Sequence, residues 1–205
     1  MFKYIVALGI IFSGVQAWAD DCLSFKNTPT VNISKPDINV SIIQPQEEME
    51  LAHHGHVIAS LFQEIGIVAE AVFIKTGFCV SIKSIDVKYG YNDFLVHIDK
   101  SYKKNTCAFN AVLDHEQKHI DTYLSVIDEF KQEIEETFSV AADSVMPVFI
   151  EKKSDFNAAV EALHQELQSH PDLILMTQKI KAAEEIRNKK IDQIEDGADL
   201  MKCFE

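Results

Sequence analysis

The chain has 205 residues and a formal net charge of −13, from 32 acidic and 19 basic side chains. Such an acidic protein repels the phosphates of nucleic acids and anionic lipids, so we expect neither as a partner. The length suits a single hydrophobic core, and no Gly/Ser-rich or Pro-rich linker divides the chain.

The first 19 residues have the pattern of a secretory signal peptide. Lys3 precedes a short apolar run at 4–12, and small residues flank Trp18 at 17–19. This pattern predicts cleavage before Asp20, which leaves residues 20–205 as one domain in the periplasm or outside the cell. The apolar run is too short for a membrane span and no second one follows, so we expect no span after cleavage. The oligomeric state is left open.

The pattern of residues 30–75 predicts an extended segment followed by a helix. Apolar and polar residues alternate over 30–44, and Pro36 interrupts them, which is typical of a strand near a sheet edge. Residues 46–75 are interpreted as a helix that ends at the breaker Gly77.

Two short β-like runs then cover residues 78–87 and 94–100. The turn-forming residues at 89–93 lie between them and predict a hairpin loop. We expect a small antiparallel sheet here, ahead of the next helix.

Residues 108–138 contain neither Gly nor Pro, and their apolar residues recur at three- and four-residue steps, which predicts a long amphipathic helix. Within it, residues 115–119 read His-Glu-Gln-Lys-His. On a helix, His115 and His119 lie one turn apart on one face, where they can share a zinc ion. Glu116 is then free to act as a general base toward a zinc-bound water.

The carboxy-terminal third is predicted to be helical. Pro147 marks a break, and two helices follow at 154–169 and 172–200, separated by Ser-His-Pro-Asp at 169–172. The apolar side of the second helix is expected to pack on the core.

The four cysteines favour two disulfides, because an even count in an oxidising compartment is typical of disulfide pairing. They are Cys22, Cys79, Cys107 and Cys203. Three pairings are open; our preferred one joins Cys79 to Cys107 and Cys22 to Cys203.

The stretch from Leu113 to Asp121, Leu-Asp-His-Glu-Gln-Lys-His-Ile-Asp, resembles the signature of the bacterial secreted zinc peptidases grouped as domain of unknown function 922. The resemblance implies that His115 and His119 bind zinc, that Glu116 is the catalytic base, and that Asp121 supports the site from outside the metal's ligands. It also implies a zincin-like α+β fold of a minimal gluzincin type, mainly helical with a small antiparallel sheet before the motif helix.

A catalytic zinc usually has three protein ligands, so one more is needed. A later helix is the natural source, and His164 lies at the border of the apolar stripe of 154–169. We rank His164 first and Glu161 second; the alternative is that His164 is an ordinary half-buried histidine. Tyr123, one turn after His119, is a candidate donor to the oxyanion, or else a core aromatic residue.

These residues predict a secreted or periplasmic zinc peptidase that hydrolyses peptide bonds with a zinc-bound water activated by Glu116. A peptide or protein substrate is expected to pair with an edge strand at 94–99, or this segment is a plain core hairpin. The alternative function is a non-catalytic zinc-binding or partner-binding helical protein. Four protein ligands would favour that alternative, and an open coordination position would favour the enzyme.

Overall fold

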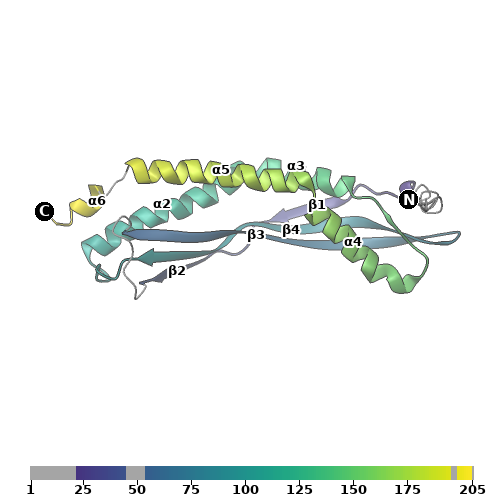
Figure 1. The fold of residues 1–205 in the computed structure, drawn as a ribbon, viewed down its shortest axis with the longest axis horizontal. Coiled ribbons are helices and arrows are strands. Elements are labelled where there is room, and N and C mark those ends of the chain that lie inside the picture. Colours follow the sequence, from purple (N-terminus) through teal and green to yellow (C-terminus); the bar gives the residue numbers. More distant parts are fainter. Residues whose placement is uncertain (1–21, 45–53, 195–197, 205) are drawn as a thin grey trace, which may run out of the picture.

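A computed structural model of the protein describes residues 22–44, 54–194 and 198–204. Two long antiparallel strands, β3 (Gly55–Ile74) and β4 (Gly77–Ile98), form a hairpin that runs along most of the elongated molecule (Figure 1). Ile74 pairs with Gly77, so residues 75–76 make a two-residue turn. The predicted signal peptide, residues 1–19, lies outside the described residues.

Strand β4 is the centre of a mixed sheet. β3 pairs with it on one side, and three short strands follow one another along its other side. They are β5 (Val148–Ile150), β1 (Thr30–Ser34) and β2 (Asn39–Ile43). β1 and β2 run parallel to β4 and β5 runs antiparallel. Extended structure at a sheet edge is therefore confirmed for residues 30–44, whereas the prediction of a small, purely antiparallel sheet is wrong.

The prediction of a helix at 46–75 is wrong in the described part, where residues 55–74 form strand β3. Its β-branched residues, including Val57, Ile58, Ile65 and Ile67, lose side-chain freedom in a helix and pack well on a pleated surface. Pairing along nearly the whole length of β4 then selects the strand.

The predicted hairpin loop at 89–93 is also wrong, because β4 continues through it. Ala59 pairs with Phe94 while Leu61 pairs with Tyr91, so the register shifts here and β4 has one residue more than β3. Such an extra residue is a β-bulge, which bends a strand without ending it. Gly90 has φ +142°, a conformation that favours glycine.

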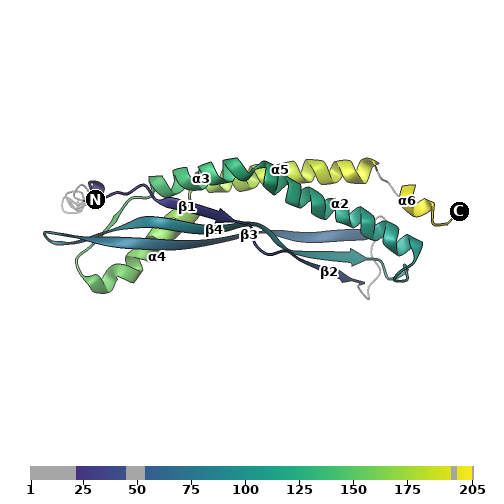
Figure 2. The ribbon, with the colours of Figure 1, turned by 180° about the vertical axis from the view of Figure 1, so that it is seen from behind.

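Helices cover the sheet as a second layer. α2 (Cys107–Glu129), α3 (Lys131–Ser144) and α5 (Pro171–Ile194) lie along the hairpin, as the views in Figures 1 and 2 both show. α4 (Phe156–Gln168), after a 3-10 turn at Lys153–Asp155, crosses the half of the hairpin that carries its turn and runs back to the start of α5. The short α6 (Ala198–Met201) ends the described chain near the start of α2. The protein is thus an α+β protein.

The long helix predicted over 108–138 is divided at Phe130, which ends α2 and precedes α3. Thr106 caps α2: its hydroxyl oxygen accepts a hydrogen bond from the backbone N–H of Phe109, 3.3 Å away. The predicted break at Pro147 is confirmed, because α3 ends at Ser144 and β5 begins at Val148.

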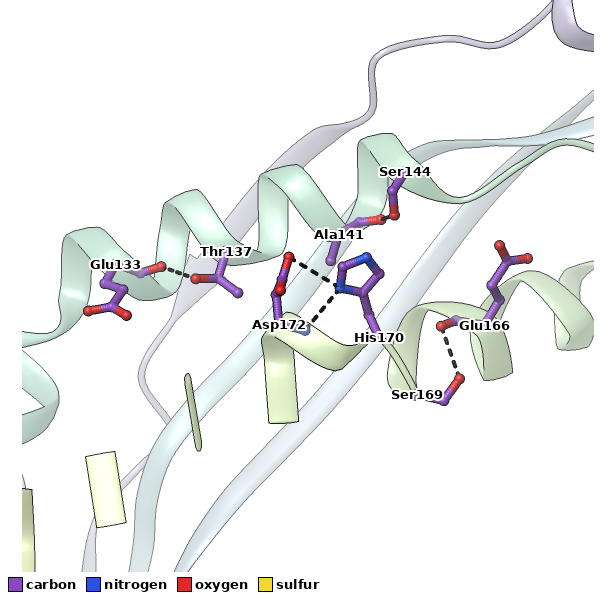
Figure 3. Close-up of polar contacts among 8 residues, drawn as sticks. All are labelled: Glu133, Thr137, Ala141, Ser144, Glu166, Ser169, His170 and Asp172. Atoms are coloured by element: carbon purple, nitrogen blue, oxygen red, sulfur yellow. Dashed lines mark hydrogen bonds and ion pairs between the residues drawn. The ribbon is translucent and has the colours of Figure 1, made fainter. Parts of the chain in front are cut away.

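The predicted pair of carboxy-terminal helices is confirmed, with a junction at His170 (Figure 3). The backbone N–H of Asp172 donates to Nδ1 of His170, at 3.3 Å, and Pro171 occupies the first position of α5, where no N–H is needed. The apolar side of α5 packs on the core, with Ile180 fully buried.

All four cysteines form disulfides, but the expected pairing is wrong. Cys22 is bonded to Cys79 and Cys107 to Cys203. The first bond ties the segment before β1 to the start of β4, and the second ties the start of α2 to the segment after α6. Among the described residues, no helix is long and apolar enough to cross a membrane.

Candidate metal centre

Helix α2 brings His115 and His119 together on the side that faces α5. Their Nε2 atoms lie 3.2 Å apart, and the side chain of His119 is only 11% exposed. The inward direction predicted for His119 is therefore observed. Val112, Glu116 and Ile120 of the same helix are buried, so both rings lie at the edge of the packed face.

A third donor comes from α5. Oδ1 of Asp192 lies 3.1 Å from Nε2 of His119 and 3.5 Å from Nε2 of His115. In the part of the chain that the structure describes, these are the three His, Cys, Asp or Glu residues whose donor atoms gather within 4.8 Å of one another. The side chain of Asp192 is 61% exposed, so the cluster opens toward solvent on this side.

The spacing of the three donor atoms fits a tetrahedral zinc ion. Zinc–ligand bonds of about 2.0–2.1 Å at tetrahedral angles place neighbouring ligand atoms about 3.3–3.4 Å apart. The three observed separations are 3.1, 3.2 and 3.5 Å. Two imidazole nitrogens and one carboxylate oxygen are also a donor set that zinc accepts.

Asn188 orients the ring of His119 from behind. Its Oδ1 lies 3.0 Å from Nδ1 of His119, one turn of α5 before Asp192. An amide oxygen accepts hydrogen bonds, so an N–H at Nδ1 would donate to it and leave the lone pair of Nε2 for a metal ion. A lone pair that faces a carboxylate oxygen is stabilised by a cation between them, and such outer contacts are typical of histidines that bind metal.

Glu116 is buried beside the cluster, with 3% of its surface exposed. Burial raises the pKa of its carboxyl to about 8, and the negative charge of Asp192 adds to this effect. A cation at the cluster would act in the opposite direction, because a nearby positive charge favours the carboxylate.

The start of β3 is fitted closely around Glu116. A Cβ atom at Gly55 would lie 2.4 Å from Oε1 of Glu116 and 2.6 Å from Cγ1 of Val112. Any larger residue at 55 would push against the side chains of Glu116 and Val112, so glycine fits this position best. The first residues of β3 therefore form one wall of the site.

These residues line a pocket of about 840 Å³. The first residues of β3 and His54 just before them form one side. α2 contributes both motif histidines and Glu116, and α5 contributes Asn188 and Asp192. The volume lies within the range of small-molecule and peptide sites.

The expected edge strand at 94–99 is not an edge. Its residues pair with β3 on one side and with β2 on the other, so β4 is central here. Within the described residues, β3 pairs with β4 alone, and β3 is the strand that reaches the pocket.

Tyr123 lines the same pocket, one turn after His119. Its ring packs against Tyr91 and Phe94, with centroids 4.9 and 6.1 Å away. Burial raises the pKa of Tyr123, and the charge of Glu184 is the next cause. The hydroxyl therefore stays protonated and can donate a hydrogen bond at neutral pH.

His164 does not join the cluster, which corrects the expectation that it is the third ligand. Its Nε2 lies 3.1 Å from the carbonyl oxygen of Ile65. Ile65 is eight residues along β3 from Val57, or about 26 Å at about 3.3 Å per residue. Glu161 accepts a hydrogen bond from Gln165 of its own helix and is exposed.

Asp121 does not line the pocket either. It is exposed and accepts a hydrogen bond from Gln117 of the same helix at 2.9 Å. Asn188, and not Asp121, contacts a histidine of the cluster from outside.

Sequence reasoning missed Asp192 and Asn188 because both belong to a helix 70 or so residues beyond the motif, and the facing of two helices is a tertiary property. One local signal was present. Glu184, Asn188 and Asp192 repeat at four-residue steps, which forms a polar ridge that continues the apolar stripe of α5.

Comparisons of the chain with protein-family models, with curated proteins and with solved structures find no match.

Proposed function

We propose that this protein is a zinc-dependent peptidase of the zincin-like type that acts in the periplasm or outside the cell. The observation that carries the proposal is the cluster of His115, His119 and Asp192, with tetrahedral spacing, beside the buried carboxyl of Glu116. Three protein ligands and a side open to solvent are typical of catalytic zinc sites, whereas structural sites usually have four.

Each residue then has a defined task. His115, His119 and Asp192 would hold the metal, and Asn188 fixes the ring of His119. Bound zinc would acidify a water molecule and stabilise negative charge on the attacked carbonyl oxygen.

Glu116 takes the proton from the attacking water and passes it to the leaving amine, since its carboxyl lies on the turn between the two histidines. Tyr123 donates a hydrogen bond to the carbonyl oxygen as its charge grows.

An extended peptide fits the arrangement because the start of β3 borders both the pocket and Glu116. Backbone groups along the outer side of β3 offer hydrogen bonds to a further strand, which is the mode of β-strand addition. The substrate class is therefore an unfolded segment of a peptide or protein.

A compartment outside the cytoplasm is supported by the two disulfides, since such bonds persist under oxidising conditions. The signal-peptide pattern of residues 1–19 supports the same location.

The test combines metal content with cleavage. Zinc is measured by mass spectrometry in protein expressed from residue 20 onward, for wild type, Glu116→Gln, His119→Ala and, as a matched histidine control, His164→Ala. The same preparations are incubated with a mixture of unstructured peptides, and new termini are identified by mass spectrometry.

We expect one zinc per chain in wild type, Glu116→Gln and His164→Ala, and little in His119→Ala. Cleavage should occur in wild type and His164→Ala but not in Glu116→Gln, because that variant keeps the metal and loses the base. Zinc retained in His119→Ala, or cleavage by Glu116→Gln at the wild-type rate, would contradict the proposal.

A further inference from the structure

Glu184 is a buried acidic residue with no task in the proposed chemistry. It lies on α5 and only 4% of its surface is exposed. Oε2 accepts a hydrogen bond from the hydroxyl of Tyr91, on β4, at 2.6 Å, and Oε1 has no hydrogen-bond partner among the described residues. Burial of a carboxyl group is unfavourable, so its presence at a core position needs a reason.

The position of Glu184 along α5 suggests that reason. The inner side of α5 is apolar at Leu173, Met176 and Ile180, which are all buried. It becomes polar at Glu184, and Asn188 and Asp192 follow at one and two further turns. Asp192 is about 12 Å farther along the helix at about 1.5 Å per residue, so a bond at Glu184 fixes both the rotation and the axial position of Asp192.

Two other links between α5 and the neighbouring helices, both ion pairs, are exposed. Arg187 pairs with Glu129 of α2, and Lys179 pairs with Glu133 of α3. The side chains in these two pairs are at least 38% exposed, and exposed ion pairs contribute little to a fixed geometry. The bond from Tyr91 to Glu184 is shielded from water and anchors the helix to the central strand of the sheet.

We propose that Glu184, held by Tyr91, is a positioning residue that fixes Asp192 in the metal cluster. The proposal rests on the proposed function for the zinc site itself, and adds that the affinity of that site depends on a hydrogen bond two helical turns away. Without the bond, the last two turns of α5 are held by the exposed Arg187–Glu129 pair and by the hydrogen bond between Asn188 and His119, and Asp192 moves away from the histidines for part of the time.

The test is a double-mutant cycle on zinc affinity, measured by competition with a chromophoric chelator. The variants are Glu184→Leu, Asp192→Ala and the two combined. Glu184→Leu should lower zinc affinity about 10- to 100-fold, the range for contacts that support a ligand from outside. In the Asp192→Ala background the same change should have no further effect, because the residue that it positions is gone.

Two conservative controls accompany the cycle. Glu184→Gln keeps an oxygen that accepts from Tyr91 and should bind zinc like wild type. Arg187→Ala removes an exposed link of the same helix and should also bind like wild type. If Glu184→Leu fails to fold, Tyr91→Phe takes its place, because it removes only the hydroxyl donor.

An equal loss of affinity in both backgrounds would overturn the proposal, since Glu184 would then act on the fold as a whole; an unchanged affinity in Glu184→Leu would overturn it too. If wild type binds no zinc, the proposed peptidase function fails. The positioning role of Glu184 is then tested by amide hydrogen exchange of the metal-free protein. Glu184→Leu should then speed exchange over residues 185–194 more than Arg187→Ala does, and equal exchange would overturn the anchoring role.

Discussion

The disulfide between Cys107 and Cys203 should stabilise both the fold and the metal centre. Cys107 is the first residue of α2, which carries both motif histidines, and Cys203 lies eleven residues after Asp192. The bond closes a loop with a sequence separation of 96 residues. The chain-entropy relation gives about 4.7 kcal/mol at 25 °C for a loop of this length.

The other disulfide is a matched control. Cys22 and Cys79 are separated by 57 residues, for which the same relation gives about 4.2 kcal/mol. Cys79 lies near the turn of the long hairpin and Cys107 lines the pocket, so the two bonds differ mainly in their distance from the site.

The assay compares the double variants Cys107→Ser/Cys203→Ser and Cys22→Ser/Cys79→Ser. Urea denaturation of the metal-free proteins should show that both lose several kcal/mol, about 4–5 in each case. Zinc affinity is measured under conditions in which both variants are folded. It should fall at least about tenfold, or about 1.4 kcal/mol, in Cys107→Ser/Cys203→Ser but not in Cys22→Ser/Cys79→Ser, because only the Cys107–Cys203 disulfide holds the end of α5 near α2. Equal zinc affinities in the two variants would contradict this prediction.

Three further predictions concern single side chains. Asp192→Ala should lower zinc affinity by more than about 100-fold, the upper range for residues outside the metal's ligands, whereas Asp121→Ala should leave it unchanged in the same chelator competition. Burial raises the pKa of Glu184 in the folded protein. The stability of wild type therefore falls as pH rises above the pKa of an unfolded glutamate, about 4.3. Urea denaturation should show Glu184→Gln gaining stability relative to wild type over that rise, and a constant difference would contradict this. Gly55→Ala should lower the free energy of unfolding by about 1–3 kcal/mol in urea denaturation, because its Cβ would lie 2.4 Å from Oε1 of Glu116. Gly66→Ala should change it by only about 0.5 kcal/mol, because the nearest atom to its Cβ lies 3.6 Å away.

The parts of the fold that depend on local rules were predictable. The motif helix, the inward ring of His119 and the two carboxy-terminal helices follow from spacing of 3.6 residues per turn and from Pro and Ser punctuation. The break at Phe130 was not predictable in this way, because an apolar aromatic residue continues the helical pattern.

The parts of the fold that depend on partners distant in the sequence could not be predicted in this way. Residues 55–74 form a long apolar run in which strand and helix patterns overlap, and pairing with β4 decides between them. Turn-forming residues at 89–93 became part of a bulged strand because β4 stays paired with β3 before and after the bulge. The disulfide pairing was likewise open, since four cysteines allow three pairings and only the folded geometry selects one.

The residues of the candidate site also differ in whether the local sequence or the tertiary packing brings them together. His115, Glu116 and His119 lie within five consecutive residues of one helix, so the sequence displays them directly. The place of Asp192 depends on how α5 lies over α2. His164, at the border of an apolar stripe, instead contacts Ile65 of β3, about 26 Å along the strand from Val57 at about 3.3 Å per residue.

The most direct test of the central claim is a crystal structure of the zinc-loaded protein, with the ion located by anomalous scattering. We expect one zinc at about 2.0–2.2 Å from Nε2 of His115, Nε2 of His119 and a carboxylate oxygen of Asp192, with a fourth position that no protein atom fills. A fourth protein ligand would show a structural zinc clip, and zinc bound elsewhere would contradict the site altogether.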